Sequence, residues 1–254
     1  MSTRELAVVV GSTGAMGRLI TRRLDAAGLQ VIAVARSADA LASLAAEVPG
    51  IRPCATDIAD DRAIEAIRRA VQACGAAPVR MVVQGAGVAT AGGVLDVPLA
   101  ALSDAVDIKV GGLLRLVRAV DDRLVRGSRL VAIGGHYGFE PSAYAATAGV
   151  ANAALANVVR QLSWACGSRG VTSHLIAPGP ADTERLRRVA TARGERDGLD
   201  TEAVLDAMRA ESAIGAFTTP EQIAWAIGLL LDPHADALAG GTLFMDAGRR
   251  KGLP

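Results

Sequence analysis

Short runs rich in β-branched and other apolar residues recur along the chain, and longer amphipathic or alanine-rich segments separate them. This alternation is typical of βαβ units, in which a helix returns the chain so that the next strand pairs in parallel. The runs are apolar almost throughout, as expected where helices cover both faces of a sheet. The predicted strands are Leu6–Val10, Val31–Ala35, Ile51–Ala55, Val79–Gln84, Arg129–Ile133, Thr172–Ile176 and Thr242–Met245.

The predicted fold class is α/β, a doubly wound Rossmann fold with a seven-stranded parallel sheet and helices on both faces. Its 254 residues could form two domains, but no linker, charge block or low-complexity tract divides the chain. We therefore expect one domain over residues 1–254. Helices are predicted near 15–27, 38–47, 60–74, 98–124, 142–167 and 219–231, and a polar helical insert at about 182–213.

Composition excludes several classes of function. The net charge is +1 with acids and bases interspersed, so no nucleic-acid partner is expected. The longest uncharged stretch, residues 141–159, carries hydroxyl and amide side chains that suit a buried helix better than a membrane span. The cysteines lack metal-ligand spacing and their odd number gives no disulfide framework, so we expect no metal. A cytoplasmic protein without a secretory signal or membrane anchor is predicted.

A glycine-rich turn follows the first predicted strand and runs directly into an apolar helix. Glycines allow a tight turn and let the backbone approach a pyrophosphate, which the amides and dipole of the helix N-terminus then stabilise. The alternative is an ordinary strand–helix turn, but a second strand about twenty residues on favours dinucleotide binding. The predicted cofactor-binding residues here are Gly11, Ser12, Thr13, Gly14, Met16 and Gly17.

Arg36 follows the second predicted strand, where NAD-selective proteins place an acidic residue that binds the ribose hydroxyls. An arginine at this point accommodates a 2′-phosphate, so the predicted cofactor is NADP(H). The alternative is a surface arginine at a helix start. Asp57 and Ile58, after the third strand, are predicted to contact the adenine.

Further motifs are spread along the chain: with Gly11–Gly17 and Asp57 they are Gly85–Gly87, Tyr144, Pro178-Gly179 with Thr183, and Asp246-Ala-Gly248. In the order and spacing of these motifs, the chain closely resembles the short-chain dehydrogenase/reductase family over nearly its whole length. The resemblance implies that Gly85, Ala86 and Gly87 line the adenine ribose, and that Pro178, Gly179 and Thr183 hold the nicotinamide carboxamide. It also implies that the insert at 182–213 is a substrate lid.

The catalytic set departs from the family's usual Asn, Ser, Tyr and Lys. Tyr144 stands at the tyrosine position, but Ala148 takes the place of the lysine four residues later. Gly135 takes the place of the serine, and Lys109 that of the asparagine. The ketoreductase domains of modular polyketide synthases are similar in placing lysine on the earlier helix, within Lys-Val-x-Gly. Those domains carry asparagine where this chain has Ala148 and retain the serine, so the similarity is partial.

Tyr144 is predicted to be the proton donor, and Lys109 is predicted to lower the pKa of its phenol. A phenol titrates near pH 10 and needs a nearby cation to react at neutral pH. Only two of the 27 basic residues are lysines, which favours a specific role for this one. The alternative is a solvated helix lysine. His136 follows the fifth strand, and either polarises a substrate oxygen or is an exposed loop histidine. The arginines of the insert either attract an anionic group or form the solvent-exposed face of a helix.

Three functions follow from this pattern. The first is an NADPH-dependent carbonyl reductase with Tyr144, Lys109 and His136 in its site, in natural-product metabolism by analogy with the ketoreductases. The second is a non-redox enzyme on the same scaffold, such as a cyclase, dehydratase or isomerase. The third is a non-catalytic NADP-binding protein, because a fold alone does not prove chemistry. The expected partners are a small-molecule substrate and further copies of the chain in a homodimer or homotetramer.

Overall fold

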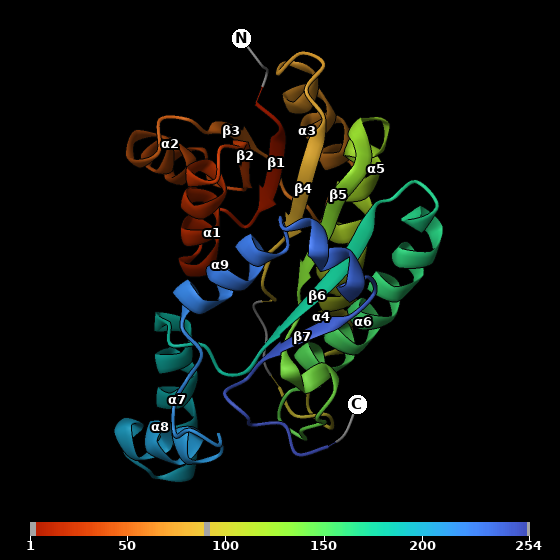
Figure 1. The fold of residues 1–254 in the computed structure, drawn as a ribbon. Coiled ribbons are helices and arrows are strands. Elements are labelled where there is room, and N and C mark those ends of the chain that lie inside the picture. The colour runs from red at the N-terminus through yellow and green to blue at the C-terminus, as the bar shows by residue number, and fades with distance from the viewer. Residues whose placement is uncertain (1–3, 89–91, 253–254) are drawn as a thin grey trace.

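The computed structural model describes residues 4–88 and 92–252, and its strands form one sheet in the order β3-β2-β1-β4-β5-β6-β7 (Figure 1). Every pairing between neighbouring strands is parallel. The predicted doubly wound, seven-stranded fold is therefore confirmed. The strands are β1 (Leu6–Val10), β2 (Gln30–Ala35), β3 (Arg52–Ala55), β4 (Val79–Gln84), β5 (Leu124–Ile133), β6 (Thr172–Pro178) and β7 (Thr242–Met245).

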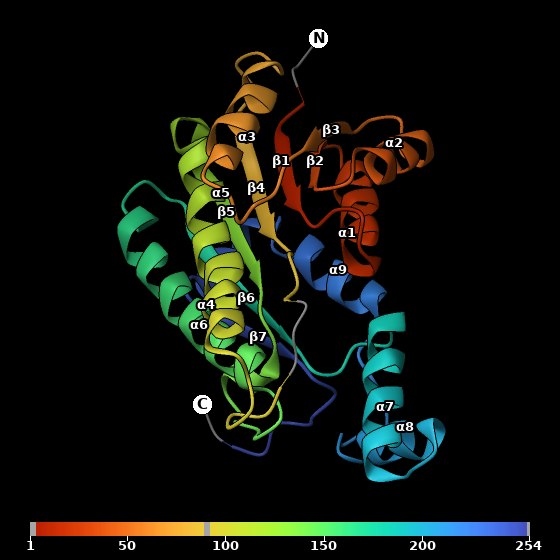
Figure 2. The same ribbon diagram turned by 180° about the vertical axis from the view of Figure 1, so that it is seen from behind.

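Helices cover both faces of the sheet (Figures 1 and 2). Successive residues of each central strand point to opposite faces of the sheet. Val8 belongs to the hydrophobic cluster with α3, α5 and α6, and Val9 belongs to the cluster with α1, α2 and α9. This explains why the strand sequences are apolar throughout. One layer comprises α1 (Ala15–Ala26), α2 (Ala38–Glu47) and α9 (Pro220–Leu229); the other comprises α3 (Arg62–Gln72), α4 (Leu99–Val106), α5 (Gly112–Val120) and α6 (Ala146–Gly167).

The polar insert forms two helices, α7 (Glu184–Asp197) and α8 (Thr201–Ala210), that project from the end of the sheet where the strands finish (Figure 1). A small apolar cluster, which includes Leu186 and Leu205, holds the two helices together. Arg249 donates a hydrogen bond to the Met208 carbonyl at 2.9 Å and so ties α8 to the C-terminal segment. None of the helices in the described ranges is both long and apolar enough to cross a membrane.

The predicted helix at 98–124 is interrupted. After α4 the chain forms a π-helical turn, η1 (Asp107–Gly111), then α5 and a short 3₁₀ turn, η2 (Asp121–Arg123). The buried Gln84 side chain donates a hydrogen bond to the Ile108 carbonyl at 2.7 Å, within the turn where the helix widens. Such π turns inside helices are frequent at functional sites.

The predicted helix at 142–167 begins only at Ala146. The preceding residues pair instead with the segment after β4: the Val94 amide donates to the Ala143 carbonyl at 2.9 Å, and the Ala146 amide donates to the Gly92 carbonyl at 3.1 Å. Because these contacts bind the backbone outside a helix, Tyr144 precedes α6. The expectation that Tyr144 lies within this helix is therefore corrected.

Two further short turns complete the chain, η3 (His136–Gly138) and η4 (Pro233–Leu238). Strand β5 begins at Leu124, five residues before the predicted start, because the Gly127 amide donates to the Gly170 carbonyl at 2.8 Å and the Ser128 hydroxyl donates to the Val79 carbonyl at 2.6 Å. These contacts lie at the far edge of the sheet from the predicted site.

Candidate active site

The strands β1, β4, β5 and β6 all finish at one edge of the sheet, which we call the carboxyl edge. The order of the strands reverses between β1 and β4, and ligands of open α/β sheets bind outside this switch point. The glycine turn, the loops after β4 and β5, and the Pro178–Thr183 segment all lie there, as the sequence predicts.

The glycine turn after β1 is built for close backbone approach. Gly11 has φ +79°, and a Cβ added there would lie 3.0 Å from the Gly85 carbonyl carbon. A Cβ at Gly17 would lie 2.0 Å from the Gly11 oxygen, so only glycine fits. Helix α1 begins after Gly14 without a side-chain cap. Its first amides are therefore available to an anion, and the turn fits a cofactor phosphate.

Other residues of the predicted cofactor turn serve the fold. The buried Ser12 hydroxyl donates to the Val34 carbonyl at 3.2 Å and fixes the turn against β2. The Thr13 carbonyl accepts a hydrogen bond from Arg18 at 3.2 Å. Met16 packs against the core under α1. Ser12 and Met16 thus use their side chains within the protein, whereas Thr13 contributes its backbone carbonyl.

Arg36 lies at the end of β2, exposed, and makes no ion pair or hydrogen bond through its side chain within residues 4–88 and 92–252. The neighbouring Ser37 caps α2 by accepting from the Ala40 amide at 3.1 Å. The Arg36 guanidinium is therefore free to bind a phosphate beside the second strand.

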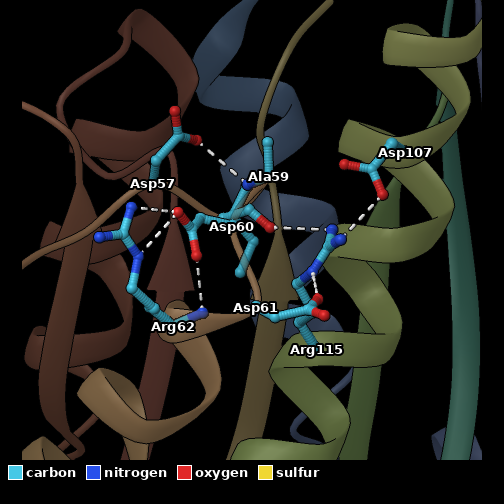
Figure 3. Close-up of polar contacts among 8 residues, drawn as sticks. Asp57, Ala59, Asp60, Asp61, Arg62, Asp107 and Arg115 are labelled. Carbon is cyan, nitrogen blue, oxygen red and sulfur yellow. Dashed lines mark hydrogen bonds and ion pairs between the residues drawn. The ribbon is translucent and has the colours of Figure 1, made fainter.

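Asp57 and Ile58 lie in the loop between β3 and α3. Figure 3 shows Asp57 in this loop, close to the side chains that link the loop to η1. The Asp57 carboxylate accepts from the Ala59 amide at 3.1 Å. The Ile58 side chain is buried in the core, so contact with a cofactor falls to its backbone. The Ile58 carbonyl accepts from Arg115 at 3.2 Å.

Arg115 joins this loop to the π turn. Its guanidinium lies 2.6 Å from the Asp61 carboxylate and 2.9 Å from the Asp107 carboxylate (Figure 3). Asp107 is the first residue of η1, so Arg115 fixes the turn that carries Lys109.

Lys109 is the buried cation of the site. Its side chain is inside the protein, with the residue 6% exposed, and Nζ donates to the Ile133 carbonyl at 2.7 Å. Burial, together with the nearby charge of Arg185, lowers the pKa of Lys109 to about 8. The alternative of a solvated helix lysine is therefore wrong. Two of the three ammonium protons remain for other partners.

His136 is buried rather than exposed in its loop, so that alternative is also wrong. Burial and the charge of Arg249 lower the pKa of His136, while a hydrogen bond to the Pro178 backbone opposes them. The ring lies 4.0 Å from that of Tyr137. His136 thus joins the loop after β5 to the loop after β6.

Tyr144 lies apart from this buried group. The residue is 64% exposed, and the Arg196 guanidinium of α7 lies 5.0 Å from its ring centroid. Its phenol therefore faces the helical insert.

Asn152 is a site residue that the sequence analysis did not identify. It lies on α6, is 5% exposed, and its Oδ1 has no hydrogen-bond partner within the described residues. A Cβ added at Gly135 would lie 2.9 Å from its Nδ2. An amide four residues after Ala148, on the buried face of an alanine-rich helix, is the signal that could have revealed it.

The segment after β6 meets the start of α7. The Gly179 amide donates to the Met245 carbonyl at 3.0 Å, and a Cβ at Gly179 would lie 3.0 Å from the Asp246 Cα. The Thr183 hydroxyl donates to the Ala181 carbonyl and accepts from the Leu186 amide, at 3.2 and 3.4 Å. Thr183 is thus the cap of α7.

Residues 10–250 match a family model described as "Enoyl-(Acyl carrier protein) reductase". The chain belongs to the short-chain dehydrogenase/reductase family. Within this short-chain dehydrogenase/reductase, the loops at the carboxyl edge correspond to the motifs on which the sequence resemblance rested.

Relatives and solved structures agree with this membership. Short-chain reductase protein NovJ from Streptomyces niveus is 30% identical over 259 residues, covering 98% of this chain and 95% of NovJ. L-Sorbose reductase from Gluconobacter frateurii, solved with NADPH and L-sorbose, has a TM-score of 0.89 at 21% identity, covering 99% of this chain and 98% of that one. A blue fluorescent protein from a metagenomic library, solved with NADPH, has a TM-score of 0.84 at 25% identity, covering 97% and 98%.

Proposed function

We propose that this short-chain dehydrogenase/reductase is an NADP(H)-dependent carbonyl reductase acting on a small molecule. The observation that carries the proposal is the buried Lys109 ammonium at the carboxyl edge, whose pKa lies at about 8. A group that titrates near neutral pH can give a proton to a carbonyl oxygen as that oxygen gains charge. This proton is the part of carbonyl reduction that the protein must supply.

The proposed cofactor fits the residues present. The uncapped start of α1 after Gly14 would hold the diphosphate, and Arg36 would hold the 2′-phosphate. Bound NADPH would supply the hydride. The complex of the blue fluorescent protein with NADPH supports this proposal, because that protein is 25% identical over nearly the whole chain.

The proton has two candidate donors. Tyr144 is the donor expected from the sequence, but its phenol lies before α6, 64% exposed and facing Arg196. Lys109 is buried at the edge, and among the described residues its ammonium donates to the Ile133 carbonyl alone, so we propose that Lys109 donates directly and that Tyr144 is the second candidate. His136, with its pKa lowered, is uncharged at neutral pH; we propose that it holds the β5 and β6 loops together.

The test compares Lys109→Met with Tyr144→Phe in NADPH oxidation assays on a panel of ketones and 3-oxoacyl thioesters. If Lys109 is the acid, Lys109→Met loses about 10²–10⁴-fold in kcat, whereas Tyr144→Phe stays within a few-fold of wild type. The lysine must be protonated to donate, so kcat/KM of the wild type should fall as pH rises through about 8. A loss confined to Tyr144→Phe would assign the proton to the phenol. Full activity of Lys109→Met would refute a role for the lysine.

The missing family groups favour a second candidate function. Gly135 and Ala148 supply no hydroxyl or ammonium, which is consistent with a non-redox enzyme such as a dehydratase or isomerase. A third possibility is a non-catalytic NADP-binding protein. NADPH binding without substrate-dependent oxidation, across the same panel, would favour these two functions over the reductase.

The proposal also covers the oligomeric state, the cellular location and the metabolic role of the protein. An apolar groove on α4, η1, α5 and α6, lined by Leu102, Val106, Val110, Leu114 and Val150, supports a homodimer or homotetramer. We also propose a cytoplasmic location, and a role in natural-product metabolism on the strength of the Lys109–Gly112 similarity to polyketide ketoreductases.

A further inference from the structure

The arginines of the helical insert are not equivalent. Arg187 pairs with Glu202 of α8 at 3.4 Å, and both Arg193 and Arg196 pair with Asp197, at 3.6 and 2.7 Å. These pairs lie on the exposed surface of the two helices. For these three arginines, the expectation of a solvated helix face is sufficient.

Arg185 and Arg188 both lack such a partner within the described residues, so Arg185 is set apart by its position. It lies in the first turn of α7, directly after the Thr183 cap, and makes no ion pair or side-chain hydrogen bond within the described ranges 4–88 and 92–252. Its guanidinium points back to the sheet: a Cβ added at Gly87 would lie 3.0 Å from Arg185 Nη1. The helical insert thus places one arginine over the loop that follows β4.

Arg185 and Lys109 therefore form a pair of cations at the carboxyl edge. The charge of Arg185 is close enough to lower the pKa of Lys109, and no carboxylate of the described residues raises that pKa measurably. Two nearby cations without an anion between them repel; solvent screens part of this repulsion because Arg185 is exposed, and a bound anion would remove the rest. A phosphate or carboxylate is the ligand that an arginine fork binds best.

The phosphates of the proposed cofactor already have their own binding groups. The start of α1 serves the diphosphate and Arg36 the 2′-phosphate, whereas Arg185 lies beside Lys109, the proposed proton donor. The remaining anion at this position is on the substrate.

We propose that Arg185 is a substrate-binding residue, and that the substrate carries a carboxylate or phosphate near the carbonyl to be reduced. This inference rests on the proposed function and specifies its substrate class. An anion held by Arg185 would shield Lys109 from the guanidinium charge and so raise the pKa of the lysine. Binding of the correct substrate would then keep Lys109 protonated when the proton is needed.

The first experiment uses the scarcity of lysine. Lysine labelled with ¹⁵N gives side-chain signals from Lys109 and Lys251 alone, and Lys251→Arg leaves Lys109. With NADP⁺ present, sodium acetoacetate should raise the pKa of Lys109, and the neutral methyl acetoacetate should not. Arg185→Gln should raise the pKa without any ligand and abolish the response to acetoacetate. Arg187→Gln is the matched control, because it removes a paired arginine of the same helix.

The second experiment compares the same two ketones as substrates. The wild type should prefer acetoacetate to its methyl ester in kcat/KM, and Arg185→Gln should reduce that preference by about tenfold, as expected for one lost charged hydrogen bond. Arg187→Gln should keep the preference. An unchanged preference in Arg185→Gln, together with weaker NADPH binding, would assign Arg185 to the cofactor diphosphate and overturn the proposal.

The two experiments separate this inference from the reductase proposal. If no ketone or thioester of the panel is reduced but acetoacetate still raises the pKa of Lys109 through Arg185, the anion subsite stands and the reductase proposal fails. If ketones are reduced without preference for acetoacetate over its methyl ester, and acetoacetate leaves the pKa of Lys109 unchanged, the subsite is refuted and the reductase proposal stands.

Discussion

Gly135 and Asn152 share one space, so the identity of each depends on the other. A Cβ at residue 135 would lie 2.9 Å from Asn152 Nδ2, closer than real contacts allow. The Asn152 Oδ1 is buried without a partner in the described residues, and an unsatisfied buried acceptor costs about 1–3 kcal/mol. A side chain at position 135 would therefore compete with Asn152 for this space.

This coupling predicts a non-additive double mutant. Gly135→Ser alone should lower the free energy of unfolding by about 1–3 kcal/mol through overpacking, and Asn152→Ala in the same chain should recover most of that loss. Denaturant unfolding of the wild type, both single mutants and the double mutant measures the coupling. Additive effects of the two substitutions would show that the residues do not compete for space.

Cofactor selectivity also belongs to a single residue. Arg36→Ala should weaken NADPH binding about tenfold or more, because a charge-assisted contact with the 2′-phosphate is lost, and should leave NADH binding unchanged. Calorimetric titration of both cofactors tests this. Arg52→Ala is the control, because Arg52 is an exposed arginine at the amino end of the neighbouring strand β3, away from the carboxyl edge. Equal affinity of the wild type for NADPH and NADH would contradict the assignment.

Among the elements, the π turn η1 decides where Lys109 points. The apolar pattern around residues 98–124 predicts a helix, but it cannot show that Gln84, on another strand, hydrogen-bonds to the Ile108 carbonyl. The start of α6 was missed for a similar reason, since contacts with residues 92–94 override the local helical preference of Tyr144 and its neighbours. Lys109 itself was identified from its type and position. Asn152 was missed because its role depends on the space that Gly135 leaves.

The Arg115 contacts predict a positioning role for Asp107. Asp107→Ala removes the ion pair that anchors η1, so Lys109 should become better solvated and its pKa should rise from about 8 towards its ordinary value. The alkaline limb of the pH–rate profile should move to higher pH with it. Asp61→Ala is the control, because it removes the other carboxylate from Arg115 without touching η1. If both variants shift the limb equally, the effect comes from Arg115 and not from the turn.

At the scale of the whole molecule, the sheet could be predicted because most strands and helices show their own hydrophobic pattern, and this pattern repeats along the chain. The strands β1, β2 and β4 are buried along almost their whole length, and the short strand and helix lengths favour parallel crossovers, so a parallel sheet between two helical layers follows from general rules. The edge strand β3 is mostly exposed, and its place in the sheet does not follow from its sequence. The position of α7 and α8 relative to the sheet could not be predicted from the sequence. It depends on contacts such as Arg249 with the Met208 carbonyl, which join segments 41 residues apart.

The last prediction concerns assembly. Leu102, Val106, Val110, Leu114 and Val150 line an apolar groove between α4, η1, α5 and α6, and Val150 is 49% exposed. A second copy of the chain related by a two-fold axis would cover the same groove on both subunits, since a symmetric interface repeats each contact.

Val150→Glu should therefore break this interface, because it places two carboxylates in an apolar contact and leaves them without partners. Sedimentation velocity at micromolar concentration should show a dimer or tetramer for the wild type and a particle of half that mass or less for the variant. Val189→Glu is the matched control: Val189 lies on α7 with a similar exposed fraction of 42%, away from the groove. A monomeric wild type, or dissociation caused equally by both substitutions, would show that this groove is not where subunits meet.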